Sequence, residues 1–152
     1  MDIILDENNI ELKVRAKDWR EAVKKSGAIL ARNGYVEERY INAMVETVKE
    51  LGPYIVVAPG LALPHAKRSD GVIKSGISII TLDEPIEFGN SANDPVYVLI
   101  GLSGSNDQAH LQILQAIASV FEDEKLVYKI AESNCKKEIV AIFNGIEVRD
   151  DA

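Results

Sequence analysis

The chain has 152 residues with 47% hydrophobic content, and its 24 acidic and 17 basic side chains give a formal net charge of -7. This length and composition allow one sizeable core, so we expect a single domain over residues 1–152. The negative charge excludes nucleic acid and anionic membrane surfaces as favourable partners, since both repel an acidic protein.

The first third of the chain predicts one strand followed by two helices. Apolar and charged residues alternate over residues 10–14, which is the pattern of a half-buried strand. Asp18 is typical of a helix N-cap, Glu21 is its capping-box partner, and the apolar stripe beyond them predicts a helix up to Gly34. A second amphipathic stripe predicts a helix over residues 37–51, with its charged side chains facing water and a Gly-Pro pair as its end.

The middle of the chain holds three short apolar runs that are rich in Val and Ile and separated by turn residues. Runs of this length and composition predict buried strands rather than helices. We therefore expect three central strands, at residues 54–57, 77–82 and 96–102.

The last third of the chain returns to the helical period. It predicts a helix from Asp107 through residue 124, a shorter helix around residues 126–131 and a last helix over residues 136–143 that Gly145 ends; the tail VRDDA is expected to fray. Helices thus flank a group of strands at both ends of the chain. This order predicts an α/β fold, a single-domain sandwich in which α-helices flank a central mixed β-sheet of about five strands.

The cellular context follows from what the sequence lacks. The one cysteine, Cys135, excludes an internal disulfide, and the start of the chain lacks the basic flank and apolar core of a signal peptide. The longest apolar runs are too short to cross a bilayer and are interrupted by Pro and Gly. We expect a cytoplasmic protein without direct membrane insertion.

The loop GLSGSNDQAH, residues 101–110, leads from a predicted strand into a predicted helix. Asn106 or Asp107 would cap that helix, which puts His110 in its first turn, where free N–H groups and the helix dipole favour an anion. Gly101 and Gly104 would let the backbone approach such a group. The loop matches neither a Walker A nor a dinucleotide pattern, so we predict no nucleotide cofactor. Alternatively, His110 simply helps to cap the helix.

The loop GLALPHAKRSD, residues 60–70, places a histidine directly after a proline. Pro64 stiffens the backbone ahead of His65, so the imidazole can be aimed reproducibly. With an ordinary pKa of about 6.5, this side chain is largely neutral at cytoplasmic pH and can attack an electrophile such as phosphorus. Lys67 and Arg68 could screen the dianion that results. Alternatively, His65 is a surface loop residue and the two cations form a solvated turn.

These residues resemble a known family. The segment LALPHA, preceded by GPYIVVAPG and followed by DQAHLQILQAIASVFEDE, is similar to the IIA component of the bacterial sugar phosphotransferase system (PTS), in its type-2 fructose-mannitol class. The resemblance continues through RNGYVEERYINAM and TLDEPIEFG and covers nearly the whole chain. The form PYIVVAPGLALPHA is most similar to the ascorbate and galactitol-like subgroup.

The resemblance implies a phosphoryl carrier. His65 matches the histidine that accepts a phosphoryl group from the phosphocarrier HPr, on Nε2 by family precedent, and passes it to a cysteine of the IIB component. The membrane component IIC is served indirectly through IIB. His110 matches the second active-site histidine, which stabilises the phosphoryl group through a hydrogen bond. The resemblance implies no metal and no cofactor.

One departure limits the resemblance. Many mannitol-type members carry an arginine near the end of the helix before the histidine loop, where MVETVKELG has Thr47 with Lys49 nearby. Lys49, Lys67 or Arg68 would then have to offset the phosphate charge, and a lysine lacks the two-pronged geometry of a guanidinium. Cys135 has no phosphate-cradling loop around it, so we expect it to pack structurally rather than to act as the thiol of a IIB partner.

Two further interpretations stay open. A regulatory, nitrogen-type IIA protein would use its phosphorylation state to control other proteins rather than to feed a transporter. A metal-binding or purely structural α/β domain is the third interpretation, although two histidines with neither a neighbouring cysteine nor arranged carboxylates make a poor zinc site. Transfer to a sugar-specific IIB would argue against the regulatory role, and a stoichiometric metal would favour the third interpretation.

Overall fold

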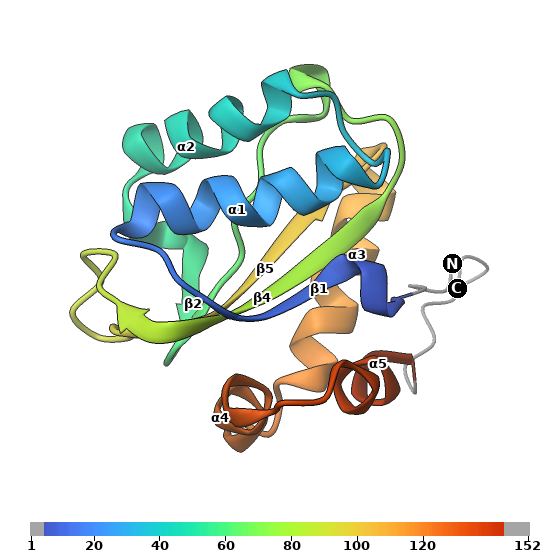
Figure 1. Cartoon of the computed structure of the whole chain (residues 1–152). Helices are drawn as coiled ribbons and strands as arrows, with labels where there is room; N and C mark the ends of the chain where they lie inside the picture. Colours follow the sequence, from blue (N-terminus) through green and yellow to red (C-terminus); the bar gives the residue numbers. More distant parts are fainter. Residues whose placement is uncertain (1–4, 145–152) are drawn as a thin grey trace.

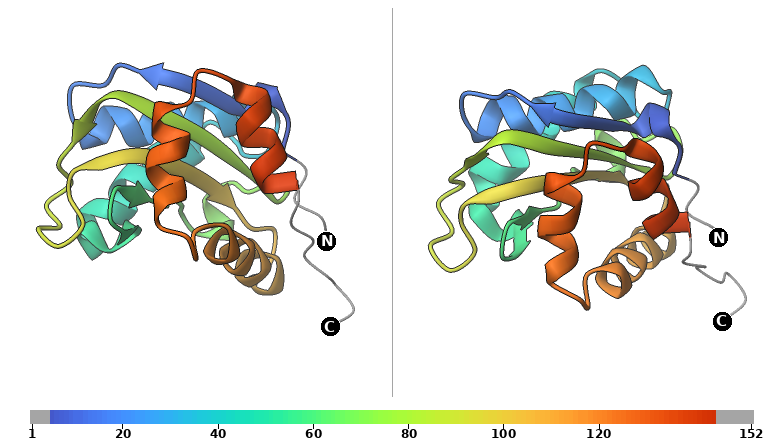
Figure 2. Two further views of the ribbon diagram at one scale, coloured as in Figure 1. Left: turned by 90° about the horizontal axis from the view of Figure 1, so that it is seen from below. Right: turned by 60° about the horizontal axis from the view of Figure 1, so that its bottom comes forward.

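A five-stranded sheet lies between two layers of helices in the computed structural model, which describes residues 5–144 (Figure 1). The strands are β1 Ile10–Val14, β2 Val56–Ala58, β3 Leu61–Ala62, β4 Gly76–Ile86 and β5 Val96–Ser103. The helices are α1 Trp19–Arg32, α2 Arg39–Leu51, α3 Asp107–Val120, α4 Lys125–Glu132 and α5 Lys136–Asn144, with short 3-10 helices at Glu7–Asn9, Pro53–Ile55 and Arg68–Asp70. Helices α1 and α2 cover one face of the sheet, and α3, α4 and α5 cover the other (Figure 2).

The sheet is mixed, with strand order β1-β4-β5-β3-β2. β1 runs parallel to β4, and β3 runs parallel to β5, whereas β4 pairs with β5 and β2 with β3 in the antiparallel sense. The expected α/β sandwich with a mixed sheet of about five strands is confirmed. None of the helices within residues 5–144 is long and apolar enough to span a membrane.

The strand predictions are only partly right. The apolar runs 77–82 and 96–102 form β4 and β5 at the centre of the sheet. The run 54–57 is predicted to be central, but its first half lies in the 3-10 helix Pro53–Ile55 and its second half begins β2 at the edge. Gly52 and Pro53 cause this difference, because a positive-φ glycine (φ 77°) and a proline reverse the chain immediately before the run.

Strand β1 changes face halfway along. Ile10 and Leu12 pack with the core under α3 to α5, whereas Val14 packs with the core under α1 and α2. The pairing with β4 shifts register between Glu11 and Val14, and Lys13 lies there with φ 54°. A bulge of this kind reverses the side-chain alternation. The two-residue alternation that the sequence shows over residues 10–14 is therefore interrupted in the structure.

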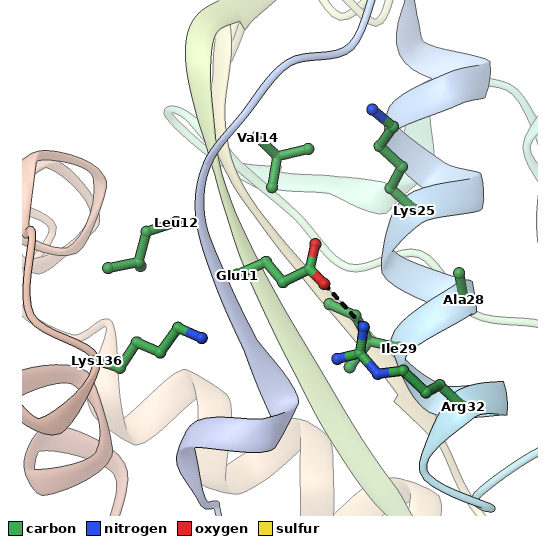
Figure 3. A pocket seen from close by; sticks show the side chains of 8 residues that line it. All are labelled: Glu11, Leu12, Val14, Lys25, Ala28, Ile29, Arg32 and Lys136. Carbon is green, nitrogen blue, oxygen red and sulfur yellow. Dashed lines mark hydrogen bonds and ion pairs between the residues drawn. The ribbon is translucent and has the colours of Figure 1, made fainter.

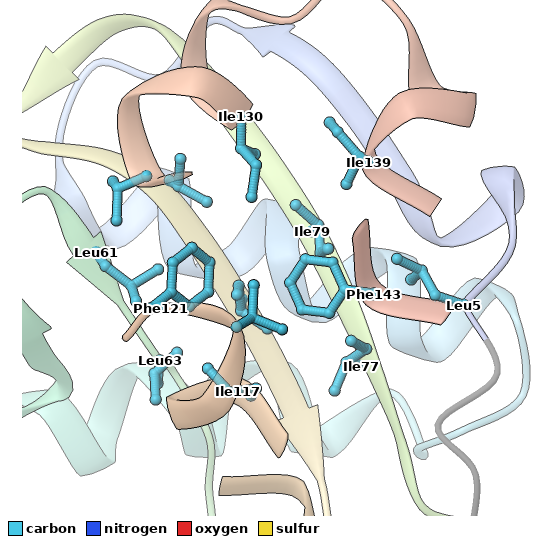
Figure 4. Packing of buried hydrophobic residues seen from close by; sticks show 14 of the residues in the cluster. Leu5, Leu61, Leu63, Ile77, Ile79, Ile117, Phe121, Ile130, Ile139 and Phe143 are labelled. Carbon is cyan, nitrogen blue, oxygen red and sulfur yellow. The ribbon is translucent and has the colours of Figure 1, made fainter. Parts of the chain in front are cut away.

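The alternation of side chains along the central strands separates two cores. Val98, Ile100 and Leu102 of β5 point to the face covered by α3 to α5, and Leu99 points to the face covered by α1 and α2. Figure 4 shows the first of these cores, in which the rings of Phe121 and Phe143 meet edge to face with centroids 6.1 Å apart. Burial on both faces holds β4 and β5 rigidly, so the loop that follows β5 starts from a fixed point.

Several helix ends follow the predicted caps, but α3 ends at Val120 rather than at the predicted residue 124. The Asp18 carboxylate accepts a hydrogen bond from Glu21 N–H (2.9 Å) at the start of α1, and Gly34 (φ 80°) follows its end. Helix α2 begins at Arg39, two residues later than expected, and stops at Gly52. The residue before that stop, Leu51, belongs to the predicted buried stripe but is 56% exposed. The predicted helix end at Gly145 and the predicted fraying of VRDDA lie outside the described residues.

A hollow of about 550 Å³ runs beside β1 at the free edge of the sheet (Figure 3). It contains Lys25 and Arg32 from α1 and Lys136 from α5. The Arg32 guanidinium donates to the Glu11 carboxylate (2.9 Å) and to the Asn8 carbonyl (3.1 Å). These contacts fasten the edge strand to α1.

Candidate active site

The loop that carries His65 follows β3 and is held against β5 of the central sheet. Residues Leu61–Ala62 form β3, which pairs with β5, and the chain then leaves the sheet through Leu63 and Pro64. The Pro64 carbonyl accepts a hydrogen bond from Leu102 N–H (3.1 Å), and Leu63 N–H donates to the Ile55 carbonyl (2.8 Å). The backbone on which His65 stands is therefore held by β5.

The His65 ring is oriented by its own loop. Its Nδ1 atom lies 2.7 Å from the carbonyl oxygen of Leu63. Because a carbonyl oxygen can only accept a hydrogen bond, Nδ1 carries the proton, and in the neutral ring Nε2 carries the lone pair. The ring is only partly buried. The contact leaves Nε2 as the free, nucleophilic nitrogen.

Tyr40, fully buried on α2, holds the end of the histidine loop. Its hydroxyl accepts a hydrogen bond from Ala66 N–H (2.9 Å) and donates to the Leu102 carbonyl (2.8 Å). Burial is the main cause that raises the pKa of Tyr40 to about 12, so the hydroxyl keeps its proton. In the sequence, Tyr40 stands out only as part of the apolar stripe of α2. A tyrosine hydroxyl on a buried helix face needs a hydrogen-bond partner, and this was the sequence feature that could have indicated its role.

His110 lies in the first turn of α3, as predicted. Asn106 is the N-cap, and its side chain accepts a hydrogen bond from Ala109 N–H (2.8 Å). A Cβ on Gly104 would lie 2.8 Å from His110 Cβ and 2.9 Å from its Cα. Gly104 thus serves close packing against the helix start. Gly101 does the same inside the sheet, where a Cβ would lie 2.7 Å from the Ser78 hydroxyl. Of the two glycines that were predicted to let the backbone approach a ligand, Gly104 lines the hollow that contains both histidines, whereas Gly101 does not.

The two predicted histidines lie side by side although 45 positions separate them in the sequence. Their ring centroids are 5.2 Å apart, with 54° between the ring planes. Burial, and after it the neighbouring His65, lowers the pKa of His110 below its usual value, while Asp107 opposes this effect. At neutral pH His110 is therefore a neutral ring that can donate one hydrogen bond.

Both histidines line one hollow of about 460 Å³, which we call the histidine pocket. It is built from the end of α2, the loop after β3 and the start of α3. Its lining consists of Thr47, Leu51, His65, Ala66, Lys67, Arg68, Ser69, Gly104, Asn106, Asp107 and His110.

Of the three cations proposed from the sequence, two line this pocket and one does not. Lys67 and Arg68 belong to its lining, and the Arg68 guanidinium lies 3.8 Å from the Asp107 carboxylate. Lys49 lies outside the lining and pairs with Glu46 at 3.2 Å. Thr47 does face the pocket, with its hydroxyl donating to the Ala43 carbonyl (2.8 Å). The structure thus leaves Lys67 and Arg68 as the cations beside His65.

Cys135 is exposed immediately before α5, so the prediction that it packs structurally is wrong. Its backbone, not its thiol, has the structural role: Cys135 N–H donates to the Ser133 hydroxyl (3.1 Å) ahead of the helix. Across residues 5–144, the His, Cys, Asp and Glu side chains form no group of three or more that could hold a metal ion.

The fold has counterparts among solved structures. The Streptococcus mutans protein PtxA matches with a TM-score of 0.87 and 32% identity, over 95% of this chain and 94% of its own. A chain of the Escherichia coli complex of enzyme IIAMTL and phosphorylated enzyme IIBMTL matches with a TM-score of 0.83 and 26% identity, over 93% of this chain and 98% of its own. The class of protein is therefore that of the IIA components of phosphotransferase systems.

The family can be stated more closely. The chain belongs to the EIIA 2 family of the phosphoenolpyruvate-dependent sugar phosphotransferase system, whose model matches residues 3–145. The ascorbate-specific PTS system EIIA component of Escherichia coli K12 is 35% identical over 144 residues, which are 94% of each chain. The protein is thus similar in sequence to ascorbate-specific components, as the form of the histidine motif predicted.

Proposed function

We propose that this protein, acting in the cytoplasm, accepts a phosphoryl group from phospho-HPr on Nε2 of His65 and passes it to a cysteine of its cognate IIB. The observation that supports this most is the 2.7 Å contact between His65 Nδ1 and the Leu63 carbonyl, which leaves Nε2 with the lone pair. The protein would serve the membrane component IIC only through IIB. Neither a metal nor a cofactor has a part in the proposed chemistry.

The transfer is a displacement at phosphorus. The Nε2 lone pair forms the new phosphorus–nitrogen bond as the bond between phosphorus and HPr breaks, and its electron pair stays with HPr. The Nδ1 proton remains in place, so the phosphorylated ring carries positive charge, which the Leu63 carbonyl stabilises by accepting the hydrogen bond. In the second step a IIB thiolate forms a phosphorus–sulfur bond and the electron pair returns to Nε2. Catalysis rests on alignment and charge stabilisation.

His110 has a supporting role in this proposal. Its neutral ring, 5.2 Å from that of His65, donates one hydrogen bond to a phosphoryl oxygen. Its lowered pKa matters here, because a permanent cation would hold the dianion more tightly and slow its release. The pair therefore suits a carrier that must both accept and discharge.

The partners and the substrate class are inferred from relatives. The IIAMTL of Escherichia coli has been solved in complex with phosphorylated IIBMTL, which supports a IIB partner here. Curated relatives are named ascorbate-specific, so the cognate transporter is proposed to take ascorbate or a chemically related sugar acid. Leu51, exposed at the rim of the histidine pocket, offers apolar surface for a docking protein.

Intact mass after incubation with phosphoenolpyruvate, enzyme I and HPr tests the proposal. We expect the wild type and His110→Ala to gain one acid-labile phosphoryl group, and His65→Ala to gain none. Gain by His65→Ala, or no gain by the wild type, would refute the assignment.

The second half of the test adds the IIB of an ascorbate system. Phosphorylated protein should lose its phosphoryl group to that IIB, and a IIB whose acceptor cysteine is replaced by serine should leave it intact. Stable phosphorylated protein in the presence of native IIB would favour the regulatory, nitrogen-type role instead.

A further inference from the structure

We infer that Arg68 is the residue that neutralises the phosphoryl group on His65, and that it exchanges Asp107 for the phosphoryl oxygens when His65 is phosphorylated. This inference rests on the proposed function. In the structure the Arg68 guanidinium faces Asp107, and both side chains line the histidine pocket together with His65 and His110. The ion pair therefore connects the histidine loop to the start of α3 beside the two rings.

The backbone under Arg68 is held, whereas its side chain is not. Arg68 begins a 3-10 helix in which Lys67 N–H donates to the Asp70 carboxylate (3.1 Å). Arg39 of α2 donates to the Ser69 carbonyl (2.9 Å), and Glu37 N–H donates to the Gly71 carbonyl (2.7 Å). These contacts fix the backbone of Arg68 relative to α2. The Arg68 side chain can therefore reorient without movement of the loop.

The contact between Arg68 and Asp107 is of the kind that exchanges readily. The two groups lie 3.8 Å apart and their side chains are 56% and 104% exposed, so water already solvates both charges. An exposed ion pair at this separation contributes little to stability. A phosphoryl dianion carries about twice the charge of a carboxylate and likewise offers the planar guanidinium a pair of oxygens, so its greater charge makes it the stronger acceptor.

The other candidate cations fit this role less well. Lys49 pairs with Glu46 outside the lining, and the Thr47 hydroxyl is already used by the Ala43 carbonyl. Lys67 does line the pocket, but its ammonium is a point charge that cannot hold two oxygens in a fixed plane. Lys67 therefore provides the matched comparison, since it carries the same charge one position away.

The experiment measures the equilibrium of phosphoryl transfer between HPr and this protein, by ³¹P NMR of mixtures of the two. We expect Arg68→Gln to shift the equilibrium toward phospho-HPr by about tenfold or more, the size expected for a lost charge-assisted hydrogen bond. Lys67→Gln should shift it by less than about threefold, since only a screened charge is lost. Arg68→Lys should recover part of the loss. The pKa of the phosphohistidine should also be higher in Arg68→Gln than in the wild type, because a neighbouring positive charge is lost.

Asp107→Asn tests the exchange itself. Removal of the competing carboxylate should move the equilibrium toward the phosphorylated protein, and this gain should vanish in the Arg68→Gln, Asp107→Asn double variant.

A gain that persists without Arg68 would mean that Asp107 acts by direct repulsion, which would overturn the exchange. Equal behaviour of Arg68→Gln and Lys67→Gln would overturn the Arg68 assignment alone. A wild type that accepts no phosphoryl group would overturn the proposed function and this inference together.

Discussion

The histidine pocket and the hollow beside β1 are similar in size, yet they differ as candidate sites. The hollow beside β1 measures about 550 Å³ and the histidine pocket about 460 Å³, and each is lined by basic side chains. At the edge of the sheet, Arg32 is held by Glu11, and Lys25 by Glu21 (3.4 Å) and the Arg15 carbonyl (2.5 Å). In the histidine pocket Nε2 of His65 is left free by the contact of Nδ1, and the nearest guanidinium is only loosely paired.

The difference shows that a hollow with cations is not by itself an anion site. Two of the basic groups beside β1, Lys25 and Arg32, already have acceptors at short range, so an incoming anion would have to compete with carboxylates of the protein itself for them. The histidine pocket combines the proposed nucleophile His65, the proposed neutral donor His110 and a cation, Arg68, whose exposed ion pair with Asp107 is long. Three substitutions and one pH dependence test this contrast, from the largest expected effect to the smallest.

Gly104→Ala should have the largest effect on stability. The new Cβ would lie within 3 Å of the backbone and Cβ of His110, which the helix start cannot move aside easily. We expect a loss of about 2–3 kcal/mol of unfolding free energy, together with slower phosphorylation because His110 shifts. Urea denaturation and a phosphorylation time course measure both effects. Gln108→Ala, an exposed residue in the same turn, is the control. Wild-type stability in Gly104→Ala would show that the contact is not tight.

Tyr40→Phe should cost about 1–2 kcal/mol, since it leaves Ala66 N–H and the Leu102 carbonyl without their buried partner. Phenylalanine keeps the ring volume, so no cavity adds to the loss. We expect the phosphorylation rate to fall as well, because Ala66 follows His65 directly. Tyr54→Phe, on an 81% exposed side chain, should change neither quantity in urea denaturation and rate measurements. An unchanged rate in Tyr40→Phe would mean that Pro64 and Leu102 alone hold the loop.

The stability of the protein should depend on pH through His110. Its pKa is lowered in the folded state from the usual 6.5, mainly by burial, so below pH 6.5 the unfolded chain binds more protons than the folded one. Stability should therefore fall as the pH drops through 6.5 and level off below the folded pKa. Urea midpoints at about pH 7.5 and about pH 5.5 measure this change. His110→Gln should lose part of the pH dependence that the wild type has, and an identical dependence in both proteins would contradict its assignment to His110.

The smallest effect is expected at the edge of the sheet. Arg32→Ala removes an ion pair whose side chains are 52% and 40% exposed, so the loss should be about 0.2–1 kcal/mol. A double-mutant cycle with Glu11→Gln, followed by urea denaturation, isolates the pair. Phosphorylation by HPr should proceed at the wild-type rate in each variant. A slower rate in Arg32→Ala would connect the two hollows and remove the contrast between them.

The elements that could be predicted from the sequence are mostly those whose apolar pattern extends over several residues. The apolar stripes of α1 and α2, the Asp18 cap and the runs that became β4 and β5 were all readable, because each repeats a period over several residues. Strand β3 has only two residues and thus no period, and it was missed. The bulge in β1 was hidden because Lys13 gives no sign of its positive φ.

The sequence was sufficient to name the two candidate histidines of the site, but not the residues that support them. The Pro64-His65 pair and His110 in a first helical turn could be named as candidates, and the structure brings the two rings together. The roles of Tyr40 and Gly104 depend on contacts between segments far apart in the chain, which no local pattern encodes. The same reason explains why three cations remained equivalent in the sequence, although only Lys67 and Arg68 line the pocket.

The most direct test of the proposed relay is to identify the nitrogen that carries the phosphoryl group. Long-range ¹H–¹⁵N correlation spectra of protein labelled at its histidines, recorded before and after phosphorylation by HPr, distinguish Nδ1 from Nε2 and His65 from His110. We predict that phosphorylation occurs on Nε2 of His65, with Nδ1 still protonated against the Leu63 carbonyl. Phosphorylation of His65 on Nδ1, or of His110 on either nitrogen, would contradict the proposed relay.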